Sequence, residues 1–592
     1  MPHALTAELP RPFPCPPAPA PETGLPRRAL VLGDDTRSFL AVVRSLGRAG
    51  WEVHAAPWDF SSPALASRYL SGVHRLPAYS LGAENWVAAL RRLTEEAGIG
   101  LVVPCDDRGL IPLHRHADEF AGAGLALPNA QAMEVYFDKG KTRALAQRLG
   151  VPIAPGRPLG PADDAALLAR EFGVPLALKP RSSYRLGQAG AKSSVQIVRS
   201  ETALAEALRR IADRSDWLVE GFFRGEGVGL SILAERGAVR LAFQHRRLHE
   251  ASETGGSSSR ESEPLDPRLL DAVERMAEAT ALHGVAMFEF RREPATGKFI
   301  LLEVNARFWG SLPLAVAAGA DFPAAAAALY AGETPCDRQS YEPGVVRRDL
   351  GGEYYRILKE AEAAALLPGR LFSLARGLGG LALSLTNGGA FDSFAPDDPA
   401  PWQADRKALI LHFGEAVAAR LTPASWRRRR GQAALRRARE RLEQGRRGIV
   451  MLCHGNICRS PFAGERLRTL AREAGLELEI VSAGTIALEG RGSPPEALAA
   501  AREWREDLAN HRSRDLDLKA AEQAAAVVVF DQKNVEEVRR LGLAGRLNLL
   551  RLADLIGQAE ISDPYGHGRA GFSRAYAEID QAVRLLAQGL AR

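Results

Sequence analysis

Short apolar runs alternate with amphipathic stretches along the first part of the chain. The run RALVLGDD is followed by an amphipathic stretch that ends at Gly50, and the run WEVHAA begins directly after it. The stretch GIGLVVPCDD repeats the apolar run and its polar end. Strands that alternate with helices predict a parallel sheet of the doubly wound type. Asp34, Asp35 and Asp106 then lie at the carboxyl ends of strands, where such sheets bind ligands.

The pattern changes several times, and we expect five segments. Residues 1–26 are proline-rich and are expected to be a disordered tail, because such a stretch cannot bury a core. Residues 27–132 form the first α/β unit, and residues 133–332 form a second unit that opens with the helical stretch DKGKTRALAQRLG. Residues 333–446 are predicted to be a mostly helical connector, whose arginine-dense end is typical of a solvated helix. The strand GIVML then opens a separate doubly wound domain over residues 447–592.

Composition limits the possible classes of protein. The chain has 592 residues, too many for one core, and a net charge of +6, too small for this length to indicate nucleic-acid binding. Five scattered cysteines cannot form a disulfide framework and no secretory signal is visible, so we expect a cytoplasmic protein. No run of about 20 apolar residues predicts a membrane span. The nearest candidate, Leu371 to Leu385, is short and interrupted by Arg376, and is expected to be a packed helix.

The segment CHGNICRSP, from Cys453 to Pro461, follows an apolar strand and carries the clearest chemistry in the chain. A zinc site would need further ligands, but no cysteine follows Cys458 and the downstream histidines stand alone. A CxxC redox pair would have two residues between its cysteines, and this segment has four. A nucleophile fits better, because a strand–loop–helix turn aligns backbone N–H groups into an anion cradle that favours a thiolate at Cys453.

Neighbouring residues supply the rest of a phosphate site. Arg459 can bind a phosphate bidentately above Cys453, and Ser460 can donate a hydrogen bond to the thiolate. Covalent thiophosphate catalysis also needs an acid for the leaving oxygen, which Asp563 in ISDPYGHG can supply. The predicted catalytic residues are Cys453, Arg459 and Asp563, and the supporting loop is His454, Gly455, Asn456, Ile457, Cys458 and Ser460.

The C-terminal segment resembles the low-molecular-weight protein tyrosine phosphatases. The matching pieces, in family order, are CHGNICRSP, SAGT, HRSRDL, VVVFDQKN and DPY. The resemblance implies a Cys453 nucleophile, an Asp563 general acid, and a Cys458 that can trap oxidised Cys453 as a disulfide. The segment SAGTIALEGRGSPPEAL is similar to the corresponding segment of the bacterial members that oppose tyrosine kinases of exopolysaccharide export. A phosphotyrosine protein, such as a bacterial tyrosine kinase, is therefore the implied partner.

One residue departs from this family pattern, and one other activity is compatible with it. Leu488 stands where other members carry an aromatic wall, which leaves Tyr565 as the aromatic candidate for contact with the substrate.

Arsenate reductase is the alternative within this fold. That activity needs a further relay cysteine, and none follows Cys458.

Acidic residues lie in two apolar strands of the second unit. Glu289 lies in GVAMFEF, and Glu303 and Asn305 lie in LLEVNARFWGS, so strand alternation sends them to chosen faces of neighbouring strands. Two carboxylates and an amide form an oxygen-rich site suited to Mg²⁺. Upstream, Lys179 ends the strand VPLALKP, and Glu220 lies at a strand end before a turn.

These pieces together resemble an ATP-grasp domain with its preceding sheet domain. DKGKT, LKP, VEGFFRGEG, FQHRRLHE, FEF and EVNARFWGS occur in family order. The resemblance implies ATP and Mg²⁺, or Mn²⁺ in its place, and a carboxylate activated as an acylphosphate that an amine attacks. The loop around Arg246, Arg247 and Glu250 would face the acceptor, and the sequence identifies neither substrate. The implied ATP-binding residues are Lys139, Lys179, Glu220 and Arg307, and the implied metal ligands are Glu289, Glu303 and Asn305.

The sequence therefore predicts a multidomain α/β protein with two activities. A pre-ATP-grasp parallel sheet and an ATP-grasp α+β domain would form an Mg·ATP-dependent ligase. A helical connector would join it to a doubly wound parallel-sheet protein tyrosine phosphatase, in a setting of exopolysaccharide or envelope regulation. The alternative is that the ATP-grasp half is a nucleotide-binding module that regulates the phosphatase through the connector. No nucleic acid and no integral membrane segment are expected.

Overall fold

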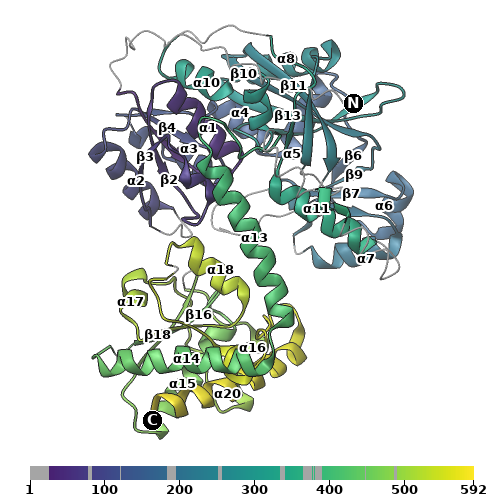
Figure 1. Cartoon of the computed structure of the whole chain (residues 1–592). Helices are drawn as coiled ribbons and strands as arrows, with labels where there is room; N and C mark the ends of the chain where they lie inside the picture. Colours follow the sequence, from purple (N-terminus) through teal and green to yellow (C-terminus); the bar gives the residue numbers. More distant parts are fainter. Residues whose placement is uncertain are drawn as a thin grey trace, which may run out of the picture.

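The computed structural model describes residues 26–77, 83–120, 122–182, 195–211, 213–250, 257–333, 340–363, 376–377, 379–380, 390–446, 448–485, 490–543 and 545–591 (Figure 1). The proline-rich tail before residue 26, Leu488, and most of the stretch from Leu371 to Leu385 lie outside these described residues. Within the described part of the chain, no helix is long and apolar enough to cross a membrane.

The first unit is a five-stranded parallel sheet in the order β3-β2-β1-β4-β5. Strands β1 and β4 at its centre are apolar except for Arg28, and their apolar side chains are buried because helices cover them. The carboxyl ends of β1 and β4 carry the acidic residues that the sequence places there. The elements are β1 (Arg28–Leu32), α1 (Ser38–Arg48), β2 (Glu52–Ala56), η1 (Pro63–Ala66), β3 (Leu70–Val73), α2 (Glu84–Glu96), β4 (Leu101–Pro104), α3 (Asp107–Arg115), η2 (Ala117–Phe120) and β5 (Gly124–Leu125).

The second unit contains two antiparallel sheets. A small sheet has the order β6-β9-β7-β8, and a larger sheet has the order β14-β13-β10-β11-β12-β15. Strand β15 pairs with β12, so the larger sheet continues past the boundary expected at residue 332. The elements are α4 (Ala130–Tyr136), α5 (Lys139–Arg148), β6 (Gly156–Pro158), α6 (Ala165–Phe172), β7 (Leu176–Pro180), β8 (Gln196–Val198), α7 (Glu201–Arg210), η3 (Arg214–Asp216), β9 (Trp217–Gly221), β10 (Glu226–Glu235), β11 (Ala238–Glu250), β12 (Ser257–Glu263), α8 (Pro267–Ala279), β13 (Gly284–Arg292), β14 (Phe299–Asn305), α9 (Leu312–Ala317), α10 (Phe322–Tyr330) and β15 (Val346–Arg348).

The connector is attached at both of its ends. Its described helices are α11 (Leu350–Ala363), α13 (Ala400–Leu421) and α14 (Ala424–Glu443), and α13 runs from the N-terminal units to the C-terminal domain (Figure 1). Before α13, the buried Asp398 accepts a hydrogen bond from Arg44 Nε at 2.9 Å, which joins the connector to α1. The prediction of a solvated arginine-rich helix is wrong in one respect, because Ala434 and Ala438 of α14 are buried in the core of the C-terminal domain.

The C-terminal domain is a four-stranded parallel sheet in the order β17-β16-β18-β19. The rings of Phe462 and Tyr576 stack 3.9 Å apart where α15 meets α20, next to the loop that follows β16. The predicted multidomain α/β architecture is confirmed. The elements are β16 (Gly448–Cys453), α15 (Arg459–Glu473), β17 (Glu479–Gly484), α16 (Pro495–Glu503), α17 (Leu518–Gln523), β18 (Ala526–Val529), α18 (Gln532–Arg540), β19 (Leu549–Arg551), α19 (Leu552–Ile556) and α20 (Gly568–Ala591).

Two candidate active sites

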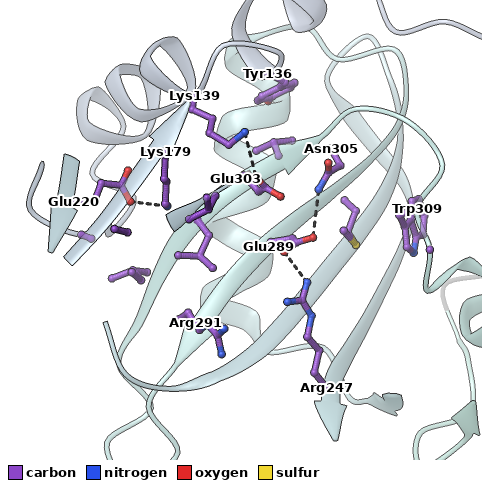
Figure 2. A pocket seen from close by; sticks show the side chains of 18 of the residues that line it. Tyr136, Lys139, Lys179, Glu220, Arg247, Glu289, Arg291, Glu303, Asn305 and Trp309 are labelled. Carbon is purple, nitrogen blue, oxygen red and sulfur yellow. Dashed lines mark hydrogen bonds and ion pairs between the residues drawn. The ribbon is translucent and has the colours of Figure 1, made fainter. Parts of the chain in front are cut away.

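A cavity of about 600 Å³ is lined by residues from both antiparallel sheets (Figure 2). Lys179 of β7 and Glu220 of β9 line it from the small sheet, and Glu289 of β13 and Glu303 of β14 line it from the larger sheet. Residues that lie more than 120 positions apart in the chain therefore share one site. This volume is in the range of small-molecule sites in proteins.

One end of the cavity concentrates cationic side chains. Lys179 Nζ lies 2.5 Å from Glu220 Oε2, and Arg143 Nη1 lies 3.1 Å from Glu220 Oε1, so both oxygens of this buried carboxylate are paired. Lys139, the first residue of α5, lies 3.4 Å from Glu303 Oε2. Both lysines are thus held by carboxylates inside the cavity, where they can bind phosphate oxygens.

The three predicted metal ligands lie together. Glu289 and Glu303 are directly opposite each other on β13 and β14, and the amide of Asn305 donates to Glu289 Oε1 at 3.4 Å. Burial would raise the pKa of Glu303, but Lys139 and Lys179 outweigh it and lower that pKa, so the carboxylate is ionised. Among the described residues, no group of three or more His, Cys, Asp and Glu could hold a metal. Two carboxylates and an amide nevertheless fit Mg²⁺, which commonly uses one or two carboxylates together with phosphate oxygens.

Arg307 connects this cavity to the first unit. Its Nε donates to Asp107 Oδ1 at 2.6 Å, and its Nη2 lies 3.4 Å from Asn305 Oδ1. Asp107 begins α3, immediately after the carboxyl end of β4. The sequence analysis did not assign Asp107 to the site, although its position after a buried parallel strand was the available signal.

The second site lies at the carboxyl end of β16. Cys453 Sγ lies 3.0 Å from Ser460 Oγ, and the Asn456 amide donates to the same oxygen at 2.9 Å. The serine oxygen therefore accepts from Asn456, and its own proton is within reach of both the sulfur and the Ala483 carbonyl oxygen, 3.3 Å away. Asn456 has a φ of 51°, in the left-handed region that bends the loop back on itself.

Residues from a neighbouring segment hold this loop in place. His511 Nε2 lies 2.6 Å from the Asn456 carbonyl oxygen, and the Arg514 N–H donates to Asn456 Oδ1 at 3.0 Å. In the sequence these two residues stand out only as part of a family motif, which assigns them no role. Their contacts show that they shape the loop.

Arg459 is almost fully buried and is held from two sides. Its Nη1 donates to Asp531 Oδ2 at 2.5 Å, and its Nη2 donates to Asp563 Oδ2 at 3.0 Å. The Arg459 Nε–H has no hydrogen-bond partner among the described residues. Asp531 also caps α18 through the Asn534 N–H, and the sequence analysis missed its contact with Arg459. A cap residue directly after a parallel strand was the available signal.

The two cysteines of the loop differ in environment. Both are buried, but for Cys458 desolvation together with the nearby Asp563 and Cys453 raises the pKa of the thiol well above the usual range. It is therefore a neutral thiol at physiological pH, and it is not a second nucleophile.

A further pair links the loop to α18. His454 Nδ1 lies 2.5 Å from Glu537 Oε1, and the Thr485 hydroxyl donates to Glu537 Oε2 at 2.6 Å. Burial would raise the pKa of Glu537, but these two contacts lower it, so the buried carboxylate is ionised. The sequence analysis did not identify Glu537, since it lies 83 positions from His454.

Comparison with known families identifies two domains in the chain. Residues 448–592 match the model for low molecular weight phosphotyrosine protein phosphatases, and residues 213–350 match the model for "ATP-grasp in the biosynthetic pathway with Ter operon". The Escherichia coli K12 phosphatase Wzb is 30% identical over 142 residues, which are 24% of this chain and 94% of Wzb. The probable phosphatase AmsI of Erwinia amylovora is 31% identical over 144 residues, 24% of this chain and 97% of AmsI.

Among solved structures, the biotin carboxylase domain of Hydrogenobacter thermophilus 2-oxoglutarate carboxylase matches 54% of this chain and 73% of its own, with 18% identity and a TM-score of 0.43. Both resemblances predicted from the sequence are confirmed by the family models. The chain therefore carries an ATP-grasp domain, and through its C-terminal domain it belongs to the low-molecular-weight protein tyrosine phosphatase family.

Proposed function

We propose that the chain is a bifunctional enzyme that hydrolyses phosphotyrosine in a protein and, at a separate site, uses Mg·ATP to join a carboxylate to an amine. The phosphatase proposal depends on one observation above all, the convergence of Cys453, Ser460, Arg459 and Asp563 around one short loop. The similarity of SAGTIALEGRGSPPEAL to the bacterial members that oppose tyrosine kinases of exopolysaccharide export supports exopolysaccharide or envelope regulation, with a tyrosine kinase as the phosphoprotein. We place both reactions in the cytoplasm.

In the phosphatase reaction, Cys453 attacks phosphorus while Ser460 and the loop N–H groups stabilise the negative charge. Arg459 binds the equatorial phosphate oxygens, and its unpaired Nε–H is the donor best prepared for this contact. Asp563 gives a proton to the tyrosine oxygen as it leaves, and then accepts one from the water that hydrolyses the thiophosphate.

The proposed test is hydrolysis of a phosphotyrosyl peptide. Cys453→Ser should abolish turnover, and Asp563→Asn should lower kcat, because the tyrosine oxygen then leaves without a proton donor. Full turnover by the Cys453→Ser variant would contradict the assignment. We favour a phosphatase over an arsenate reductase because the described cysteines beyond the loop consist of Cys105 alone, which is buried in the first unit.

For the ligase, the supporting observation is the placement of Lys139 and Lys179 beside the acidic pair Glu289 and Glu303. The two lysines bind phosphate oxygens, and Arg307 stabilises charge on the group in transfer. Mg²⁺, when bound by Glu289, Glu303 and Asn305, neutralises phosphate charge. Binding of Mg·ATP with a dissociation constant that rises at least about 10-fold in Lys179→Met tests this placement, because one lost charged contact is worth about 1.5–3 kcal/mol.

A second candidate function is nucleotide-dependent regulation of the phosphatase, and one contact favours it. The C-terminal end of α18 is capped by the first unit: the Phe60 N–H donates to the Arg540 carbonyl oxygen at 2.7 Å, and Arg75 Nη2 donates to the Leu541 carbonyl oxygen at 2.8 Å. The same helix carries Glu537, which contacts the catalytic loop. Any coupling would therefore run through α18 rather than through the connector that the sequence suggested.

The test is phosphatase turnover with and without Mg·ATP. If ATP regulates the phosphatase, Mg·ATP should change the turnover, and Arg75→Gln should remove this change. The control is Arg92→Gln, because Arg92 is exposed on α2. Equal turnover with and without Mg·ATP would exclude this second function.

A further inference from the structure

The cavity continues past the metal ligands to an inner end. There it is lined by Arg37 of the first unit, His245 of β11, Arg260 of β12, and Trp309 after β14. Figure 2 shows Trp309 on the opposite side of Glu289 and Asn305 from Lys179. This inner end lies away from the proposed ATP phosphates, and nothing in the proposed transfer step uses its side chains.

Two glycines of β10 lie beneath side chains of β11 that line the cavity, Gly229 beneath His245 and Gly227 beneath Arg247. The strand register places Gly229 between His245 and Glu289. A Cβ atom on Gly229 would collide with the His245 ring, and a Cβ atom on Gly227 would lie 2.6 Å from Cδ of Arg247. Because both positions lack side chains, the side chains of β11 lie across β10 and the cavity stays open toward β12.

Among the described residues that line the inner end, the buried polar atoms without a hydrogen-bond partner are nitrogens, and behind them Asp392 Oδ1 is unpaired as well. Trp309 Nε1 and Arg260 Nε are buried and have no hydrogen-bond partner among the described residues, and neither group can accept a hydrogen bond. His245 Nδ1 is also buried without a described partner. Native proteins rarely leave buried donors unpaired, so a ligand that brings acceptors is the simplest explanation.

The charged side chains that line the inner end are those of Arg37 and Arg260, and carboxylates lie behind both of them. The Arg37 guanidinium lies over Gly310, whose Cβ position is 3.2 Å from Cζ, and no described residue accepts a hydrogen bond from it. Arg260 is paired with the buried Asp392. The charge of Arg37 interacts with Asp349, Asp35 and Asp392, but its guanidinium donates no hydrogen bond to a described residue, so its N–H groups can bind an acceptor in the cavity.

We propose that the inner end binds an anionic group, a carboxylate or a phosphate, at the end of the acid substrate remote from the carboxyl that reacts. This inference rests on the proposed ligase function for the reacting end. Arg260 on β12 is three strand positions from Glu289 on β13, about 14 Å at the usual spacing of about 4.8 Å. The substrate is therefore an elongated acid with two anionic ends.

Titration calorimetry on the full chain with Mg·ADP tests this proposal. The probes are straight-chain dicarboxylates of increasing length, the monocarboxylates of equal length, and the matching ω-phosphono acids. At the best length, a dianion should bind at least about 10-fold more tightly than its monoanion, which corresponds to about 1.4 kcal/mol. The dicarboxylate and phosphono arms decide which anion is preferred. Equal affinity of monoanions and dianions at every length would overturn the proposal.

Variants of the inner end test whether the tighter binding of dianions depends on its side chains. Arg37→Gln should remove most of the dianion advantage, Arg37→Lys should retain part of it, and Trp309→Phe should reduce it. The surface variant Arg92→Gln should leave it unchanged. Arg260 is left intact because its loss would strand the buried Asp392. An undiminished dianion advantage in both Arg37→Gln and Trp309→Phe would refute the assignment of the pocket.

The same titrations distinguish this inference from the ligase proposal. If Mg·ADP binds and dianions show no advantage, the inference fails while the ligase proposal stands. If Mg·ADP does not bind but dianions keep an advantage that requires Arg37, the pocket stands and the ligase proposal fails.

Discussion

Replacement of Asp531 tests how the catalytic arginine is oriented. Asp531 accepts the shortest of the hydrogen bonds that Arg459 donates, 2.5 Å, while the contacts to the Ile561 carbonyl oxygen and Asp563 are both 3.0 Å. The Arg459 and Asp531 side chains are 1% and 10% exposed, so solvent does not screen the pair strongly. Loss of this contact should let the guanidinium move away from the phosphate.

The magnitude follows from the contacts that remain. A hydrogen bond to a charged group is worth about 1.5–3 kcal/mol, and the two surviving acceptors favour the lower limit. Asp531→Asn, which can still cap α18, should therefore lower kcat/KM by about 10-fold, since 1.4 kcal/mol is a factor of ten. Asp531→Ala also loses the cap and should cost a further ~1 kcal/mol of folding stability.

The assay is steady-state hydrolysis of p-nitrophenyl phosphate, with circular dichroism to show that each variant is folded. Asp507→Asn is the matched control, because that residue lies outside the loop and its only described side-chain contact is with a nearby N–H, 2.9 Å away. A folded Asp531→Asn variant with unchanged kcat/KM would refute the claim that this pair orients Arg459.

Further predictions concern pH, the connector and the loop. Burial lowers the pKa of His245 to about 3. Below about pH 6.5 the unfolded chain binds a proton at this residue that the folded chain does not bind. The free energy of unfolding therefore decreases as the pH falls from about 6.5 towards 3. His245→Gln should narrow the difference in Tm of the N-terminal units between pH 7 and pH 5, whereas the exposed His249→Gln should not. Gly431→Val on α14 should lower the Tm of the C-terminal domain, because a Cβ atom there would lie 3.0 Å from the backbone carbonyl carbon of Asp554. The control is Arg429→Val, since Arg429 is exposed on the same helix. Cys453 and Cys458 are both buried, and only Cys458 has a raised thiol pKa, so iodoacetamide at pH 8 should alkylate Cys453 in preference to Cys458, as peptide mapping would show. Equal labelling of both would contradict this difference.

Site residues could be predicted from the sequence where they lie close together in the chain. The loop from Cys453 to Ser460 is one continuous motif, and its predicted contact between Cys453 and Ser460 is present. Asp531 and Glu537 could not be assigned from spacing alone, because their approach to the loop depends on β18 lying beside β16 in the sheet. Which distant residues become neighbours depends on the order of the strands in the sheet, and a single sequence does not show that order directly.

The same reasoning explains the differences in the N-terminal units and the connector. Strand β15 has three residues and no apolar alternation, so only its pairing with β12 reveals it. Helix α14 is arginine-rich, yet the four-residue spacing of Ala434 and Ala438 produces a narrow buried stripe. At the cavity, the strand pattern predicted that Glu289 and Glu303 would be neighbours, whereas the unpaired donors of Trp309 and His245 depend on how separate strands pack.

The most direct test of the account is ADP release by the purified Cys453→Ser chain, which lacks phosphatase activity, with Mg·ATP and fractionated cytoplasmic small molecules. The account predicts release that needs a particular fraction and disappears in Glu303→Gln. Tight Mg·ATP binding without release from any fraction would contradict a ligase, and would leave a chain in which ATP serves only to regulate the phosphatase.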